Sequence, residues 1–391
     1  MMIHTTEERW NGRHAVRITN GGIEAVVLPG GGHIAELRFV PCAGPSVNCL
    51  WAAPWKTADP DNADFLNLTE AYGGGAMGRY MAAYTGHSLC LDNFGAPSAE
   101  DAARGVALHG EAPVRQWEIE PTQHALTAHV HLPVAGIDFE RTLRMNTEDS
   151  VLFVEETVRN QRAEEREIHW VEHVSFGPPF LDPGCSSIHA SLDHGLTWPL
   201  GYEGHELLRG NTAFEWPVAP SCDGSVSLET PFQRSSTGFI AAVRVRPDCE
   251  IAFIAALNRT LGLALVYCFR REDFPWVAVW EENRARRSAP WYGKAQVRGM
   301  EFGTTPMPVG REAIRRMGPL FGTPGSRTLP AEGARSVRYA ACLARIPKTW
   351  NSVSAVEADD VGLRLIGPHD VDGEFISIAS HDAAEFLRSK L

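Results

Sequence analysis

The sequence lacks any apolar stretch long enough to cross a membrane. Although 44% of its 391 residues are hydrophobic, no run reaches the roughly 18 apolar residues of a membrane-spanning helix. Residues 1–18 also lack the apolar segment and the small-residue cleavage site of a secretory signal. We therefore expect a cytoplasmic protein without a membrane partner.

Positive charge is scarce as well. The chain has 36 Lys and Arg against 48 Asp and Glu, so its formal net charge is −12. Basic clusters such as Arg284, Arg286 and Arg287 are short and isolated. A negative overall potential repels the phosphate backbone, so nucleic acid is not an expected partner.

Metal, redox and nucleotide motifs are missing too. The eight cysteines include no C-x-x-C pair, which argues against a zinc ribbon or a redox pair. Their even number is compatible with disulfides, but in a chain of this size we expect ordinary reduced thiols. No phosphate-binding loop or convincing metal cluster occurs, so the sequence indicates neither a metal nor another cofactor.

Short strand-like segments dominate what is present. They are rich in Val, Ile, Phe and Thr and are separated by Gly, Pro, Asn or Asp, which is typical of β-strands. Examples are HAVRIT, IEAVVLP, IAELRFV, VRQWEIE, LTAHVHLPV, FERTLRM, VLFVEETV, GFIAAVRV and IAFIAAL. These segments predict an all-β fold, a large antiparallel β-sandwich with a few short helices.

The distribution of glycine and proline along the chain predicts the domain boundaries. The 36 Gly and 26 Pro are spread along the chain, and no linker or long charge run interrupts it, so we expect one domain over residues 1–391. Helical patterns occur only at residues 311–322 and near the end, at about 380–391, where Ser380 or Asp382 could cap the helix. Ligands of such a sandwich would bind on a concave sheet face or among loops.

The segment HWVEH, His169 to His173, has two possible structures. On a helix the two histidines would be about 6 Å apart and could share a zinc ion, as in an H-x-x-E-H protease. On a strand they would be about 13 Å apart, too far for one ion. The flanking alternation of Ile168, Trp170, Val174 and Phe176 favours the strand, and the GPP that follows would stop a helix.

Four patterns in order resemble the galactose mutarotase (aldose 1-epimerase) superfamily. They are AMGRYMA at 76–82, VALHGEAPVRQWEI at 106–119, VEHVSFGPPFL at 171–181 and VRGMEFGTTPMP at 297–308. The resemblance spans residues from about 20 to 345 and implies the galactose mutarotase-like sandwich. It also implies sugar anomers as substrates, with no cofactor.

Site residues follow from that resemblance. The Glu of the family matches Glu301, which suits a base, and the strand histidine matches His173, which suits an acid because its pKa of about 6.5 allows exchange near neutrality. His109 and Arg79 match the residues that would hold the sugar oxygens. Trp280 is expected to stack on a sugar face, and Glu282 and Asn283 beside it are expected to bind the substrate.

The chain departs from the family pattern at several positions. Glu172 replaces an Asn, Phe302 and Gly303 replace a Gln, and the sugar-binding Asp has no clear counterpart. Insertion-like segments at 83–105 and 274–294 add to these differences. They indicate a divergent branch that acts on a different or larger sugar.

Several alternatives stay open. The same sandwich could be a non-catalytic carbohydrate-binding protein, or an oligosaccharide lyase or hydrolase. His109, His173 and Glu301 each have a purely structural reading, as a turn cap, a satisfied histidine or a solvated carboxylate, and Arg79 could be a structural loop residue. The sequence leaves open which sugar and anomer is used and whether the chain forms a homodimer.

Overall fold

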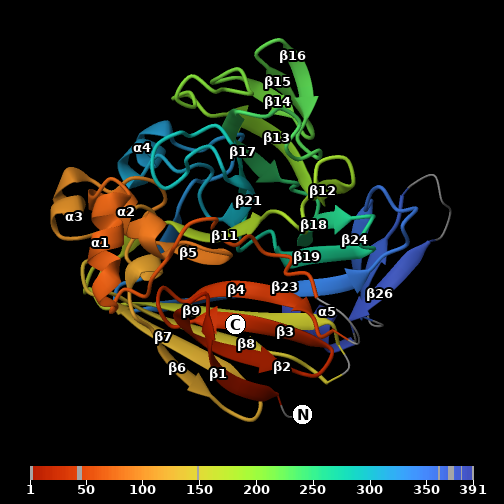
Figure 1. Cartoon of the computed structure of the whole chain (residues 1–391), viewed down its shortest axis with the longest axis horizontal. Coiled ribbons are helices and arrows are strands. Elements are labelled where there is room, and N and C mark those ends of the chain that lie inside the picture. Colours follow the sequence, from red (N-terminus) through yellow and green to blue (C-terminus); the bar gives the residue numbers. More distant parts are fainter. Residues whose placement is uncertain are drawn as a thin grey trace.

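The chain folds around two large antiparallel sheets. The computed structural model describes residues 3–41, 46–147, 149–359, 362–368, 374–379 and 381–389. A 13-stranded and an 8-stranded sheet face each other, and the largest hydrophobic cluster fills the space between them (Figure 1). The predicted all-β sandwich is confirmed; the single-domain boundary remains a prediction.

Thirteen strands form the larger sheet. In spatial order they are β1 (His4–Trp10), β2 (Arg13–Thr19), β3 (Ile23–Leu28), β4 (His33–Phe39), β5 (His87–Leu91), β11 (Trp170–Phe176), β21 (Gln296–Gly303), β20 (Trp276–Asn283), β17 (Thr237–Val245), β13 (Leu192–Thr197), β14 (Ala213–Glu215), β15 (Val218–Ser221) and β16 (Gly224–Ser227). The sheet therefore brings β5, β11, β21 and β20 together from three distant parts of the sequence.

The remaining strands form three further sheets. The 8-stranded sheet has the order β12 (Ser186–Ala190), β18 (Ile251–Asn258), β19 (Leu263–Arg270), β23 (Ala334–Arg345), β9 (Val151–Asn160), β8 (Ile137–Arg144), β7 (Leu126–Leu132) and β6 (Glu118–Pro121). Small sheets are β10 (Arg166–Ile168) with β22 (Arg327–Leu329), and β24 (Ala355–Asp359), β25 (Gly362–Ile366) and β26 (Phe375–Ala379).

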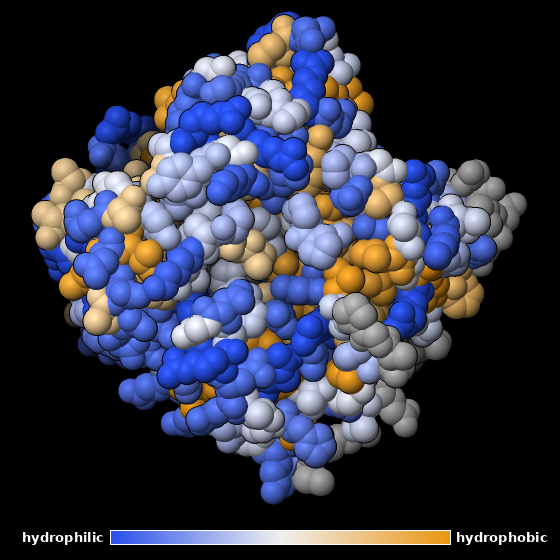
Figure 2. All heavy atoms as spheres, in the orientation of Figure 1, coloured by the Kyte–Doolittle hydropathy of each residue, from blue (hydrophilic) through white to orange (hydrophobic). Residues whose placement is uncertain are grey.

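The helices lie outside the sandwich. They are α1 (Ala63–Ala71), α2 (Gly75–Ala83), α3 (Ala99–Ala103), α4 (Arg311–Met317), α5 (His381–Arg388) and the short 3-10 helix η1 (Ala112–Val114). Of the described helices, none combines the length and apolarity needed to span a bilayer. The surface in Figure 2 is mainly hydrophilic, with hydrophobic residues in separate groups.

The sequence predicted α4 and α5 but not α1, α2 or α3. The helix expected at 311–322 stops at Met317 because Gly318 takes a positive φ of 68°. At the C-terminus the helix begins at His381, and Ser380 lies outside the described residues. The missed α1 begins at an Asn62 cap, whose side chain accepts from the Asp64 amide, and the glycines at 73–75 then turn the chain into α2.

Burial patterns show which strands are covered on both sides. In β8, residues 137, 139, 141 and 143 are buried and alternate with partly exposed ones, as expected where one face meets the core. By contrast β11 and β20 are buried at every position. Their second face is therefore covered as well, and α2 and the loops around it form that cover (Figure 1).

The C-terminal segment covers a different face. Leu363 and Leu365 of β25 and Leu387 of α5 pack with Phe153 of β9 and Val266 of β19 in a second hydrophobic cluster. In this way the small three-stranded sheet and α5 close the outer face of the 8-stranded sheet.

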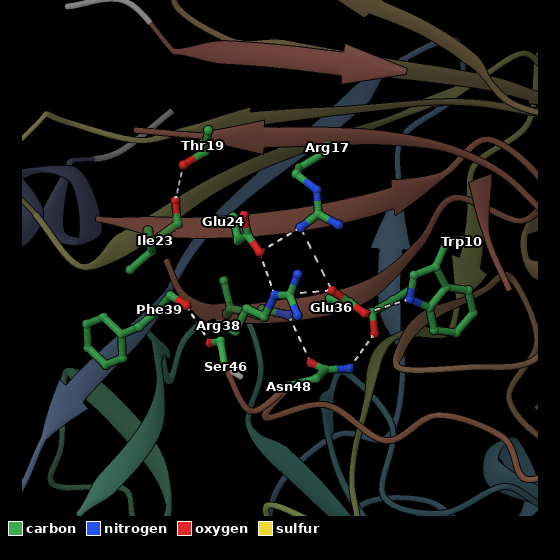
Figure 3. A network of polar contacts seen from close by, with 12 residues as sticks. Trp10, Arg17, Thr19, Ile23, Glu24, Glu36, Arg38, Phe39, Ser46 and Asn48 are labelled. Carbon is green, nitrogen blue, oxygen red and sulfur yellow. Dashed lines mark hydrogen bonds and ion pairs between the residues drawn. The ribbon is translucent and has the colours of Figure 1, made fainter. Parts of the chain in front are cut away.

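Strands β2 to β4 carry an ion-pair network on their outer face (Figure 3). The Arg17 guanidinium is 2.7 Å from Glu24, and Arg38 pairs with both Glu24 and Glu36. The Trp10 indole donates to Glu36 over 2.8 Å. Arg17, Glu36 and Arg38 are partly exposed, so each of these pairs contributes little stability, but together they make this part of the outer face polar.

A second ionic network lies deep between the two large sheets. Arg141 of β8 contacts Glu156 of β9 at 2.6 Å and reaches across to Glu172 of β11 at 3.0 Å. His87 of β5 is 2.8 Å from the same Glu172. All four side chains are at most 1% exposed, so this network joins the two sheets without solvent.

Neutral side chains complete the hydrogen bonding of that network. The Tyr339 hydroxyl donates to both Glu156 and Glu172, and the Trp170 indole also donates to both. Burial raises the pKa of Glu156 to about 8, while Arg141 counteracts this shift. Glu172 therefore has a structural place in the core, in contact with Arg141, His87, Trp170 and Tyr339.

We expect Arg141→Met to lower the free energy of unfolding by about 3 to 5 kcal/mol, because it leaves the buried carboxyl groups of Glu156 and Glu172 without their cation. Urea denaturation monitored by circular dichroism would measure this. Arg246→Met removes an exposed pair with Asp248 and should cost no more than about 1 kcal/mol. Equal, small losses in the two variants would contradict a central role for the buried network.

Candidate functional site

His173 and Glu301 meet on the covered outer face of the larger sheet. Their strands, β11 and β21, are hydrogen-bonded neighbours, with Ser175 opposite Gly299 and Val171 opposite Gly303. Because side chains alternate along a strand, His173 and Glu301 point to the face opposite the core. The His173 Nε2 is 3.2 Å from the Glu301 Oε1.

Gly299 makes room for this pair. A Cβ at this position would lie 2.4 Å from the Glu301 Oε1 and 3.1 Å from the Trp280 ring. Any larger residue would displace the carboxyl or the indole. Gly299 therefore allows Glu301 and Trp280 to approach each other on adjacent strands.

His109 completes a group of three side chains. Its ring centroid is 5.3 Å from that of His173, and its Nδ1 accepts a hydrogen bond from the Gly95 amide at 3.2 Å. The neutral His109 ring therefore carries its proton on Nε2. His109 itself has φ 66°, a rare backbone conformation outside glycine that is fixed here by two hydrogen bonds to Gly95.

Two tyrosines from the end of α2 line the group. Tyr84 stacks on Tyr80, with ring centroids 4.7 Å apart, and its hydroxyl is 2.5 Å from the Ser175 hydroxyl and 3.5 Å from the His173 Nδ1. Tyr80 packs edge-on against His109 at 4.9 Å. Both ring nitrogens of His173 thus face polar partners.

The site is closed in this structure. His173 and Glu301 are each 3% exposed and His109 is 7% exposed. A hollow of about 760 Å³ near α4 is lined by Asn93, Ala96 and Arg311 but by none of these three residues. A ligand can reach the pair only after a covering side chain moves.

Burial sets the protonation of the pair. Desolvation lowers the pKa of His173 to about 3 and raises the pKa of Glu301 well above its usual value. Both shifts favour the uncharged forms, a protonated carboxyl and an unprotonated imidazole. A single proton shared between a carboxyl and an imidazole is suited to acid–base chemistry.

Trp280 is placed in the site by its ring. The centroid of the indole is 5.9 Å from that of His173, and its Nε1 donates to the Tyr202 hydroxyl at 2.9 Å. Trp291 continues the aromatic wall at 6.0 Å from Trp280. Trp280 thus borders the His173–Glu301 pair, and its stacking on a sugar face stays a prediction.

Glu282 and Asn283 are committed to other contacts. Glu282 accepts from the Tyr202 hydroxyl and from the amides of Ala285 and Arg286. Asn283 donates to the Arg234 carbonyl and accepts from Gln296. Both residues hold loops at the edge of β20, and neither contacts the His173–Glu301 pair in the described structure.

Arg79 does not join the group either. It lies on α2 rather than in the Gly-rich loop expected from the sequence, and its guanidinium extends toward Gly105. Gly78, the residue before it, lets α2 approach α1, because a Cβ there would lie 2.3 Å from the Thr69 carbonyl oxygen. The Gly-Arg-Tyr motif thus supplies a helix contact and Tyr80 to the site.

The HWVEH segment is a strand, as predicted, and not a zinc-binding helix. His169 precedes β11, is buried, and accepts a hydrogen bond from the Phe94 amide. Within the described residues, no three His, Cys, Asp or Glu side chains are arranged to hold a metal ion. The seven described cysteines are all unpaired.

The sequence analysis did not assign four residues near the His173–Glu301 pair to the site. They are Tyr80, Tyr84, Ser175 and Ser88, which lies opposite His173 in the pairing of β5 with β11. A helical reading of the Gly-Arg-Tyr segment would have placed Tyr80 and Tyr84, four residues apart, on one face. Alternation in β11 would likewise have placed Ser175 beside His173. The signal for Ser88 is absent from the sequence, because its position depends on the pairing of β5 with β11.

Comparison with solved structures identifies the architecture. The chain superimposes on a Klebsiella pneumoniae protein named as a candidate aldose 1-epimerase with a TM-score of 0.60 and 15% identity, over 86% of this chain and 80% of that one. A galactose mutarotase-like protein from Clostridium acetobutylicum gives 0.56 and 14% over 88% and 99%. The chain has the galactose mutarotase-like fold.

A third neighbour, a galactose mutarotase related enzyme from Lactobacillus acidophilus, has a TM-score of 0.53 at 12% identity over 85% of this chain and 98% of that one. At the sequence level no family model and no curated protein matches the chain. The similarity therefore establishes the fold and leaves the chemistry to be argued from the site.

We expect Glu301→Gln to stabilise the protein at high pH. Because burial raises the pKa of Glu301, ionising this carboxyl penalises the folded state as pH rises above about 4.3, the ordinary value for Glu. The amide of Gln has no such penalty. The gain in free energy of unfolding over the wild type should be smallest near pH 5 and reach about 1 to 3 kcal/mol near pH 8.

Urea denaturation at both pH values measures this gain. The control Glu312→Gln alters an exposed carboxylate on α4 and should show no such increase with pH. If Glu301→Gln is less stable than the wild type at pH 8, the carboxyl does not carry a raised pKa.

Proposed function

We propose that the chain is a cofactor-free carbohydrate epimerase that interconverts sugar anomers through the His173–Glu301 pair. The observation that carries this proposal is the 3.2 Å contact between a buried imidazole and a buried carboxyl. The galactose mutarotase-like fold and the convergence of His109 on the same point add support.

The reaction needs two proton transfers, one at the anomeric hydroxyl and one at the ring oxygen of the sugar. One group takes the proton of the anomeric hydroxyl while the other protonates the ring oxygen, so that the hemiacetal opens to an aldehyde. After the C1–C2 bond rotates, the same groups return both protons and the ring closes on the other face. The anomeric oxygen and the ring oxygen are both bonded to C1, so two adjacent side chains can exchange protons with them.

Either member of the pair can start the cycle. With the proton on Glu301, the carboxyl acts as the acid and His173 as the base; with the proton on His173, Glu301 acts as the base, as the sequence assignment predicts. Both forms hold the same single proton, so they have the same pH dependence. The Tyr84 hydroxyl steadies the His173 ring from its Nδ1 side.

Access requires the α1–α2 segment to move in part. Arg13 of β2 holds both ends of this segment, with its Nε 2.9 Å from Asp59 before α1 and its Nη1 2.6 Å from the Ala83 carbonyl at the end of α2. The covering tyrosines lie at the end of α2. We therefore propose that rearrangement between these two anchors admits the sugar.

The closed site weighs against an oligosaccharide lyase or hydrolase. Such an enzyme binds an extended chain on both sides of the cleaved bond and needs an open cleft, whereas the pair here is 3% exposed. A non-catalytic sugar-binding protein remains the second candidate, because the same aromatic and polar walls could hold a sugar without turnover.

We expect the wild type to accelerate anomer interconversion, and Glu301→Gln and His173→Asn each to lose about 10²- to 10⁴-fold of that activity, because each removes one proton-transfer group. Polarimetry and exchange NMR on fresh solutions of hexoses, pentoses and uronates would measure it. His131→Asn, at an exposed histidine on β7, is the matched control and should keep full activity.

Three results would count against this proposal. Unchanged interconversion rates with every sugar would reject an epimerase. Sugar binding without turnover, equal in the wild type and Glu301→Gln, would favour the binding protein. New reducing ends or unsaturated products released from polysaccharide would favour a hydrolase or lyase.

A further inference from the structure

Two hydroxyl groups in the closed site have no hydrogen-bond partner of normal geometry. They are the Tyr80 Oη, on a residue that is 1% exposed, and the Ser88 Oγ, on a residue that is 0% exposed. Most buried polar side-chain atoms are hydrogen-bonded, because leaving one unpaired costs free energy. Such groups point to a ligand that completes them.

Both groups border the His173–Glu301 pair. Ser88 lies directly opposite His173 in the pairing of β5 with β11, and it faces the same side of the sheet. The Tyr80 ring is 4.9 Å from His109 and 6.2 Å from His173.

The Tyr80 hydroxyl is kept as a donor by its surroundings. Burial is the largest cause of the raised pKa of Tyr80, so the hydroxyl stays protonated. Ser88 pairs with His173 across β5 and β11, and the Tyr80 ring is 6.2 Å from the His173 ring, so Tyr80 and Ser88 both lie beside His173. One ligand hydroxyl could therefore bond to both.

The other hydroxyls of the site are already engaged. Tyr84 and Ser175 contact each other at 2.5 Å, and Tyr202 joins Trp280 to Glu282. Among the described residues, no Lys or Arg forms an ion pair or hydrogen bond with Tyr80, His109, His173 or Glu301. The free hydrogen-bonding capacity beside the pair is therefore that of neutral hydroxyls.

We propose that Tyr80 is a specificity-determining residue that hydrogen-bonds one hydroxyl of the sugar, with Ser88 completing the contact from the sheet. This inference rests on the proposed function, because it assumes that the pair acts on a sugar. Because Tyr80 lies on α2, the movement that admits the sugar also brings the Tyr80 hydroxyl against the sugar. Discrimination arises because a sugar without the matching hydroxyl leaves Tyr80 unpaired again.

The test compares Tyr80→Phe with the wild type on D-glucose and D-galactose and on their 2-, 3-, 4- and 6-deoxy derivatives. Binding is measured by calorimetry or saturation-transfer NMR, and turnover by exchange NMR. We expect Tyr80→Phe to bind the better parent sugar about 10- to 100-fold more weakly. One deoxy sugar should bind the wild type and the variant equally, and it identifies the hydroxyl that Tyr80 contacts.

Stability measurements separate recognition from folding. Because the Tyr80 hydroxyl has no partner in the free protein, Tyr80→Phe should melt at the wild-type temperature or above it. The matched control is Tyr267→Phe, whose hydroxyl contacts His87 at 3.2 Å in the core; it should melt lower and keep wild-type sugar discrimination. Ser88→Ala should weaken binding of the same sugars as Tyr80→Phe.

The outcomes distinguish this inference from the epimerase proposal. If the wild type binds sugars without turnover, the affinities of the deoxy series still test Tyr80. Unchanged affinity of Tyr80→Phe for every sugar overturns the inference, even where turnover is observed. An equal loss for all sugars together with a lower melting temperature also overturns it, because that pattern indicates a structural role.

Discussion

The buried contact of Arg141 with Glu156 and Glu172 fixes the arrangement on which the rest of the molecule depends. It joins the two large sheets where no water can replace a lost partner, so it persists only while Tyr339, Trp170 and His87 satisfy its remaining atoms. Glu172 points into this network, and because side chains alternate along β11, the next residue must point to the opposite face. The ion cluster in the core thus directs His173 toward Glu301.

The same burial that stabilises the fold sets the chemistry of the pair. Removed from water, a carboxyl and an imidazole both favour their uncharged forms. The pKa of Glu301 therefore rises and that of His173 falls. Gly299 supports this by permitting close approach. The cover from α2 therefore changes the proton affinity of the pair as well as its accessibility.

Aromatic residues connect that cover to the sheet. Trp51, Trp55, Trp291 and Trp280 follow one another at ring distances of 4.8 to 6.0 Å, and Tyr84 contacts the first of them. Offset and edge-on contacts of this kind tolerate small shifts of one ring against the next. The wall thus connects the chain before α1 to β20 of the larger sheet, while Arg13 holds both ends of the α1–α2 segment.

The sequence by itself determined the sandwich and most of its strands, because alternation is a local pattern, and the resemblance in motif order named His109, His173 and Glu301, which the structure brings together. It did not predict α1, α2 or α3, and residues of α1 and α2 are buried in one cluster with Trp280 and Val297 of the sheet. It also did not predict that Arg79 lies on α2, outside the group around His173. Only the tertiary structure decided that Glu282 and Asn283 hold loops, that Glu172 balances Arg141, and that Tyr80 and Ser88 lie unpaired beside the site. Those roles depend on which distant strands become neighbours, and local sequence does not encode that pairing.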